Sequence, residues 1–231
     1  MLWMKGWLET RWRFVFGLGF GVFVLINVAA DNVAADQQFA IVKLVNVLAF
    51  FFAFIAIMLG GAGINTQAAF RATKGLHGSM YFTLALPVSR FRLLATRVAI
   101  GMLELTTVIM LICTALWATV PQLKAQITLP EILLYGVAFA VSASSFYSVS
   151  VLLATFLDGQ WQIWGSMIVI MVLRYASDHL PVPAALDLFR PLTTDSPMVT
   201  HVFAWTGMAI SLALTAILFC LSMKIVQLRE Y

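Results

Sequence analysis

Long apolar runs alternate with short charged groups along this chain. A membrane-spanning helix needs about 20 mostly apolar residues, because the hydrocarbon core of a bilayer is about 30 Å thick. Six runs approach this length, so we predict an all-α fold: a polytopic membrane protein with six transmembrane helices in a single domain, residues 1–231. The predicted spans are residues 14–30, 43–64, 96–118, 132–156, 160–177 and 202–223.

The fifth span is the weakest of the six, because Arg174 ends the uncharged run that begins at residue 159. The distribution of basic residues supports it. With six spans and the N-terminus inside, the outer segments carry only Lys43, Lys124, Arg174 and Arg190, which leaves ten of the 14 basic residues inside. Cytoplasmic segments of membrane proteins carry such an excess of Lys and Arg. We therefore expect six spans with both termini in the cytoplasm.

Three segments outside the spans have patterns of their own. Residues 2–13 carry tryptophans on one side and charges on another, which predicts an interfacial helix; a charged tail is the alternative. Residues 66–95 form the longest inner loop. Residues 178–200 contain four prolines around an apolar stretch, which favours short re-entrant helices over an ordinary outer loop.

Composition strengthens the membrane assignment. Hydrophobic residues make up 62% of the chain and charged residues 10%, whereas a soluble domain has about 45–50% and about 25%. A water-soluble globular protein is therefore excluded. Cys113 and Cys220 lie in apolar runs and are interpreted as small core residues. The histidines and cysteines lack metal-ligand spacing, so no metal site is predicted.

The sequence lacks the common catalytic motifs. It has no GxxxxGK[ST] phosphate loop, no HExxH zinc motif and no GxSxG nucleophile turn. We expect no enzymatic activity, no cofactor and no nucleic-acid partner for this chain. Gly17 and Gly21 lie inside the first span and are interpreted as a small-xxx-small packing notch.

Glu104 is the one acidic residue well inside a predicted span. An ionised carboxylate there costs about 2.5–3.5 kcal/mol, so it must face protein or a wet cavity. It is either part of a translocation path or proton-linked site, or a protonated, hydrogen-bonded structural residue. The serine-rich fourth span has two interpretations as well, close helix packing or a polar strip. The candidate path residues are Glu104, Thr107, Ser144 and Ser148.

The stretch from Gly78 to Val98, GSMYFTLALPVSRFRLLATRV, resembles the inner loop of type-2 ABC transporter permeases. In that family a Gly opens a short amphipathic helix, a Pro-Val-Ser-Arg-like turn follows, and a basic residue starts the third span. Gly78, the turn at residues 87–90 and Arg97 match this order. The family usually has an acidic residue just before the Gly, where this chain has His77.

The resemblance implies an ABC exporter of amphiphilic substrates. It implies that two permease subunits pair, as a homodimer or with a paralogue, above cytoplasmic ATPase subunits that hold ATP and Mg. The inner loop would couple to the ATPase and the broken outer helices would act as a gate. The implied coupling residues are Lys74, His77, Gly78, Tyr81, Pro87, Val88, Ser89 and Arg90.

We expect a multi-pass protein of the bacterial inner membrane, in contact with lipid. The alternative function is a non-transporting polytopic membrane subunit, such as a scaffold or sensor partner. It would use the same six helices without a continuous polar path.

Overall fold

The computed structural model describes residues 2–31, 37–61, 89–157, 159–183 and 186–228. In these residues every regular element is a helix, in agreement with the predicted all-α class. The elements are α1 (Leu2–Asp31), α2 (Gln37–Gly60), α4 (Arg90–Thr119), α5 (Pro121–Gln126), α6 (Leu129–Ala154), α7 (Gly159–His179), η1 (Arg190–Leu192), α8 (Pro197–Thr200) and α9 (Trp205–Leu228).

Within the described ranges, four helices are long and apolar enough to cross a membrane: Val42–Gly60, Phe91–Thr119, Leu129–Ala154 and Trp205–Leu228. The chain is therefore a membrane protein, and its described part contains four candidate spanning helices. Helices α1 and α7 coincide in position with the first and fifth predicted spans. The count of six spans and the side on which the termini lie stay predictions.

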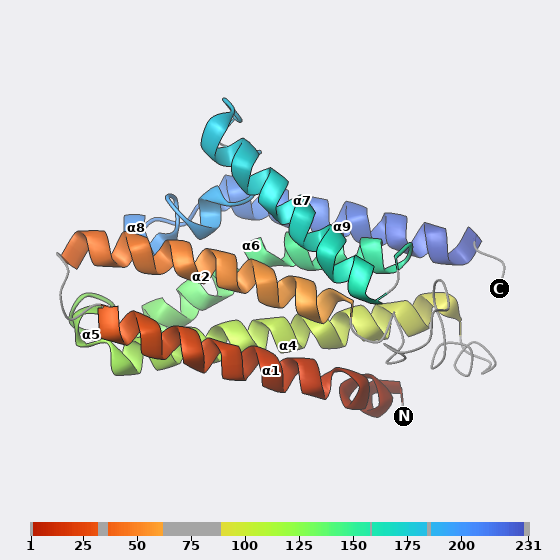
Figure 1. The fold of residues 1–231 in the computed structure, drawn as a ribbon, viewed down its shortest axis with the longest axis horizontal. Helices are drawn as coiled ribbons and strands as arrows, with labels where there is room; N and C mark the ends of the chain where they lie inside the picture. The colour runs from red at the N-terminus through yellow and green to blue at the C-terminus, as the bar shows by residue number, and fades with distance from the viewer. Residues whose placement is uncertain (1, 32–36, 62–88, 158, 184–185, 229–231) are drawn as a thin grey trace.

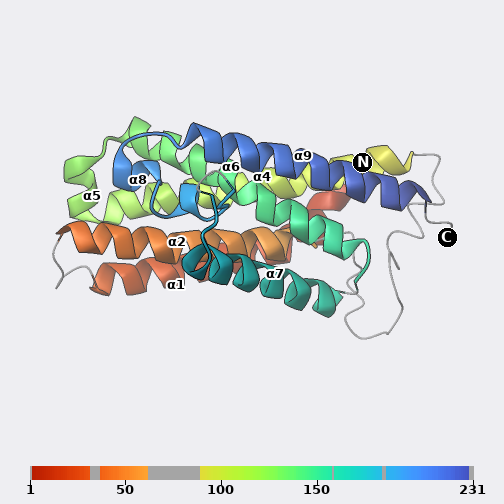
Figure 2. The ribbon, with the colours of Figure 1, turned by 90° about the horizontal axis from the view of Figure 1, so that it is seen from above.

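Helix α6 is the centre of the bundle. It packs against α2, α4, α7 and α9. In its most apolar 18-residue stretch 72% of the residues are buried, whereas in the corresponding stretch of α9 only 22% are buried. Figures 1 and 2 show α6 enclosed by its neighbours, with α7 lying obliquely across the outside. Its serines are small enough to let neighbouring backbones approach closely, which explains how α6 contacts four helices at once.

A single helix, α1, covers both the predicted interfacial helix and the first predicted span. Figures 1 and 2 show its N-terminal turns angled away from the rest of the helix. Gly17 and Gly21 face the bundle: a Cβ would lie 3.0 Å from Ile55 Cδ1 at Gly17 and 2.6 Å from Ile112 Cδ1 at Gly21. The structure therefore confirms the predicted packing notch.

The connection between α7 and α9 contains two short helical elements, η1 and α8, as the prolines predicted. Ser196 caps α8 by accepting a hydrogen bond from the Met198 amide. Both elements pack on α2 and α6, with Phe189, Leu192 and Met198 buried. Cys113 is buried as expected, but Cys220 lies on the exposed side of α9, so its interpretation as a core residue was wrong.

The first and last described residues lie at the same end of the bundle, at the right of Figure 1. The carboxyl end of α2 and the amino end of α4 also point toward this end, and α4 and α9 extend beyond α2 there. Six of the eight implied coupling residues, Lys74, His77, Gly78, Tyr81, Pro87 and Val88, lie outside the described residues.

Candidate functional site

Six polar side chains connect five helices near the level at which α2 ends. We call this set the polar layer, and it consists of Thr10, Arg13, Glu104, Tyr147, Ser150 and Gln162. Each member makes a contact with a different helix from its own. The layer therefore consists of two groups of interhelical contacts, one between α4 and the helices α1 and α6, and one at the carboxyl end of α2.

On one side of the layer, α1 meets α4. The Thr10 hydroxyl donates to Glu104 Oε1, and the Glu104 side chain is 4% exposed. Its second oxygen, Oε2, is buried with no hydrogen-bond donor among the described residues. Burial between two helices fits the interpretation of Glu104 as a structural residue. The unpaired Oε2 is compatible with the other interpretation, in which Glu104 belongs to a translocation path or a proton-linked site.

Next to Glu104, α6 meets α4 through Tyr147. The hydroxyl of Tyr147 donates to the Val98 carbonyl at 3.3 Å. It also lies directly over Gly101, where a Cβ would be only 2.2 Å from the phenolic oxygen. Gly101 is one helical turn before Glu104, so the absence of a side chain there makes room for the ring.

On the other side of the layer, three helices bind the last turn of α2. Arg13 Nη1 donates to the Met58 carbonyl at 2.9 Å. Ser150 Oγ donates to the Ile57 carbonyl at 2.8 Å. Gln162 Nε2 donates to the same carbonyl at 3.4 Å and to Ser150 Oγ. The end of α2 is thus attached to α1, α6 and α7.

The four predicted path residues are not brought together. Thr107 is exposed and donates to the Leu103 carbonyl of its own helix. Ser144 lies 2.8 Å from Thr215 of α9, oxygen to oxygen, and Ser148 donates to the Ser145 carbonyl. Glu104 meets α1 instead. The short distance between Ser144 and Thr215 supports the interpretation that the serine-rich helix packs closely against its neighbours.

Two implied coupling residues lie within the described part of the chain. Ser89 is the N-cap of α4, and its Oγ accepts from the Arg92 amide at 3.3 Å. Arg90 is the first residue of the helix. The N-cap satisfies an amide that the first turn of a helix leaves without a partner.

Sequence reasoning missed Thr10, Arg13, Tyr147, Ser150 and Gln162 as members of one site. The available signal was the end of α2: Gly60 and Gly61 terminate a helix whose last carbonyls need donors. Gln162 and Arg13 are polar residues beside apolar runs and were candidate donors. The sequence could not show which carbonyls they reach.

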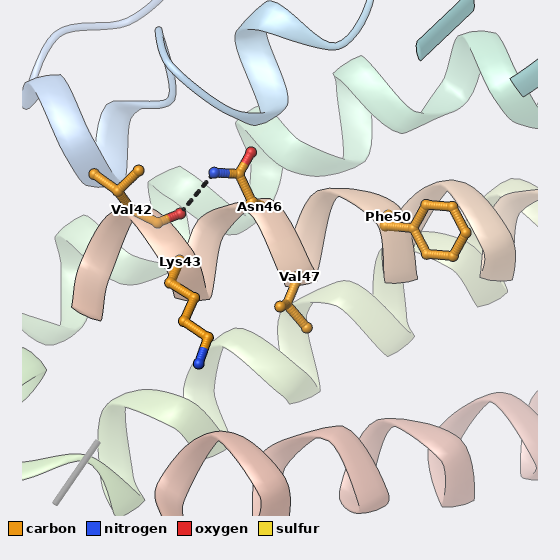
Figure 3. Close-up of a pocket in the computed structure, with 5 residues that line it drawn as sticks. All are labelled: Val42, Lys43, Asn46, Val47 and Phe50. Carbon is orange, nitrogen blue, oxygen red and sulfur yellow. Dashed lines mark hydrogen bonds between the residues drawn. The ribbon is translucent and has the colours of Figure 1, made fainter. Parts of the chain in front are cut away.

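The described residues offer little for a bound ion or cofactor. No group of three His, Cys, Asp or Glu residues among them could hold a metal ion. Figure 3 shows a shallow surface groove on α2, lined by Val42, Lys43, Asn46, Val47 and Phe50. Asn46 Nδ2 is engaged by the Val42 carbonyl of its own helix at 3.0 Å. The groove therefore lacks the convergent polar groups that orient a small ligand.

Comparisons with protein-family models, with curated proteins and with solved structures find no match to this chain.

Proposed function

We propose that this chain is the permease subunit of an ABC transporter in the bacterial inner membrane, which exports an amphiphilic substrate with energy from separate ATPase subunits. The observation that carries the proposal is the arrangement at one end of the bundle. There α2 ends and α4 begins, the two helices that flank in sequence the segment resembling a coupling loop, and the polar layer connects five helices near the carboxyl end of α2.

A partner ATPase would supply the chemical energy, since the sequence has no phosphate loop. The projecting first turn of α4 offers a place for contact with it. Ser89, Phe91 and Arg92 are exposed there, at the end where α4 extends past α2 in Figure 1. A second permease subunit, identical or paralogous, would complete the transporter.

The polar layer supports this role because it connects five helices by hydrogen bonds within the apolar core of the bundle. A transporter alternates between two packed arrangements, and a contact that both arrangements share must carry the change from one to the other. Hydrogen bonds between helices in a bilayer are individually weak, about 0.6 kcal/mol on average. Several such contacts acting together can keep helices in register while the bundle changes its arrangement.

Co-purification tests the proposal directly. We expect an ATPase with a phosphate loop to accompany the tagged chain from its native membranes in mild detergent. In the reconstituted complex, Arg90→Glu should lower transport per ATP hydrolysed, whereas Lys124→Ala, an exposed cation near the opposite end of the bundle, should not. Absence of the ATPase, or an Arg90→Glu complex that transports normally, would contradict the proposal.

One observation favours the alternative of a non-transporting subunit. Of the four predicted path residues, Thr107 is exposed whereas Glu104 is buried, and the hydroxyls of Ser144 and Ser148 are engaged within the bundle. A reconstituted complex that hydrolyses ATP but moves none of a panel of fluorescent lipids and amphiphilic dyes would support this alternative.

A further inference from the structure

The last turn of α2 is attached to other helices by its backbone. A helix leaves its last four carbonyls without intrahelical partners, and in α2, which ends at Gly60, these belong to residues 57–60. Two of them accept hydrogen bonds from side chains of three other helices: Ile57 from Ser150 and Gln162, and Met58 from Arg13. We call Arg13, Ser150 and Gln162 the clasp.

Two glycines bring the clasp residues close to α2. A Cβ at Gly60 would lie 2.7 Å from the Tyr147 carbonyl oxygen and 2.7 Å from Ser150 Cβ. A Cβ at Gly61 would lie 2.0 Å from Gln162 Oε1. Real Cβ atoms do not approach other atoms this closely, so only glycine allows this contact. The end of α2 therefore lies directly against the backbone of α6 and the amide of Gln162.

The hydrogens of the Ser150 hydroxyl and of the Gln162 amide are fully used. Ser150 gives its one hydroxyl hydrogen to Ile57 and accepts one from Gln162. The Gln162 amide directs its two hydrogens to Ser150 and to the Ile57 carbonyl. Its own oxygen, Oε1, is buried with no donor among the described residues. Burying this oxygen without a donor costs free energy, which offsets part of the gain from the two hydrogen bonds. The contact that Gln162 of α7 makes is therefore the weakest of the three clasp contacts.

The Arg13 contact adds charge to the clasp. The carboxyl end of a helix carries a partial negative charge, and a cation near it is stabilising. Arg13 Nη1 lies 2.9 Å from the Met58 carbonyl and comes from α1, whereas the serine and the glutamine come from α6 and α7. The three clasp residues thus connect the carboxyl end of α2 to three different helices.

We propose that the clasp makes the carboxyl end of α2 a transmission point, through which a displacement of α2 is passed to α1, α6 and α7 together. This inference rests on the proposed function, since the displacement would come from the ATPase side. Arg13, Ser150 and Gln162 are positioning residues that keep the four helices in register during the movement.

Two variants and one control test the clasp in the transporter complex. Ser150→Ala removes the central hydroxyl, and Gln162→Leu removes the contact from α7 at similar volume. Ser145→Ala is the control, because Ser145 is equally buried on α6 but donates to the Ser142 carbonyl of its own helix. We expect both clasp variants to assemble and hydrolyse ATP, with transport per ATP lowered about three- to tenfold, the range that one interhelical hydrogen bond corresponds to.

The control should match the wild type in both measurements. Wild-type transport per ATP in both clasp variants, in complexes that assemble, would overturn the proposal. A tenfold loss in the Ser145→Ala control would overturn it as well, because the effect would then not depend on the bonds to α2.

A second measurement uses the chain alone in detergent. Hydrogen–deuterium exchange of the amides at residues 57–60 should be about three- to tenfold faster in Ser150→Ala and Gln162→Leu than in Ser145→Ala. Unchanged exchange would disprove the clasp whether or not an ATPase associates. Faster exchange without any associated ATPase would contradict the proposed function and the transmission role, while the clasp itself would stand.

Discussion

Two connections to the central helices α2 and α6 are made by different kinds of contact. At the carboxyl end of α2, side-chain donors from three other helices bind backbone carbonyls that have no partner within α2. The connection that contains η1 and α8 instead packs apolar side chains against α2 and α6. Its Phe189 is 2% exposed, and the ring centroid of Phe189 lies 4.9 Å from that of Phe146, one helical turn of α6 before Ser150.

The difference has an energetic consequence. Removing one interhelical hydrogen bond in a bilayer costs about 0.6 kcal/mol on average, whereas truncating a buried phenylalanine costs about 3–5 kcal/mol through lost contacts and the cavity left behind. Breaking one hydrogen bond of the clasp should therefore cost much less than truncating Phe189.

Truncation of Phe189 should have the largest effect on stability. We expect Phe189→Ala to lower the free energy of unfolding by about 3 kcal/mol or more, and Gln162→Leu to lower it by about 1 kcal/mol or less. Denaturant titrations of the chain in detergent, followed by circular dichroism, give both values. Phe91→Ala, at a phenylalanine that is 54% exposed, is the control and should change little.

The comparison between the two connections would fail if the two effects were equal or their order were reversed. A loss for Gln162→Leu equal to that for Phe189→Ala would mean that the clasp holds the fold as strongly as this apolar contact does.

Added methyl groups at glycines should have intermediate effects. At Gly60 a methyl group would meet the Tyr147 carbonyl, a backbone atom that cannot rotate away, and at Gly207 it would lie 2.3 Å from Pro191 Cγ. Overpacking of this kind costs about 1–3 kcal/mol. We expect Gly60→Ala and Gly207→Ala each to lower the melting temperature in detergent.

Gly19→Ala is the matched control for both glycine variants, because nothing lies within 4 Å of a Cβ at Gly19. Alanine has a higher helix propensity than glycine, so this variant should be neutral or slightly stabilising. A melting temperature of Gly60→Ala equal to that of Gly19→Ala would show that α2 and α6 are less closely packed than the structure has them.

Much of the fold could be predicted from the apolar pattern, but the ends of the helices could not. The pattern predicted the apolar helices and the notch at Gly17 and Gly21. The apolar region of the third predicted span begins near residue 96, whereas the helix that contains it, α4, begins at Arg90. Charged residues mark the edge of the apolar region, not the end of a helix, and the Ser89 cap continues the helix past the basic residues.

The candidate site was much harder to predict. The acceptors at Ile57 and Met58 are backbone carbonyls, which exist at every residue and therefore leave no mark in the sequence. Glu104 was recognised as a buried carboxylate, but periodicity indicates only which face of a helix a residue occupies, not which helix packs against it. Its partner, Thr10, lies 94 positions away in the chain.

The smallest effect should come from the contact between Ser144 and Thr215, which lies between α6 and α9. Each hydroxyl has one hydrogen and also lies 2.7 Å from a carbonyl of its own helix, that of Val141 for Ser144 and that of Ser211 for Thr215. Only two of these three contacts can be hydrogen bonds at once, so losing one partner leaves the other satisfied. Unlike Gln162, these residues have an acceptor within their own helix.

A double-mutant cycle with Ser144→Ala and Thr215→Val should therefore give a coupling energy of about 0.6 kcal/mol or less. A coupling energy above about 1.5 kcal/mol would show that hydroxyl pairs of this kind hold the bundle at least as firmly as the clasp does.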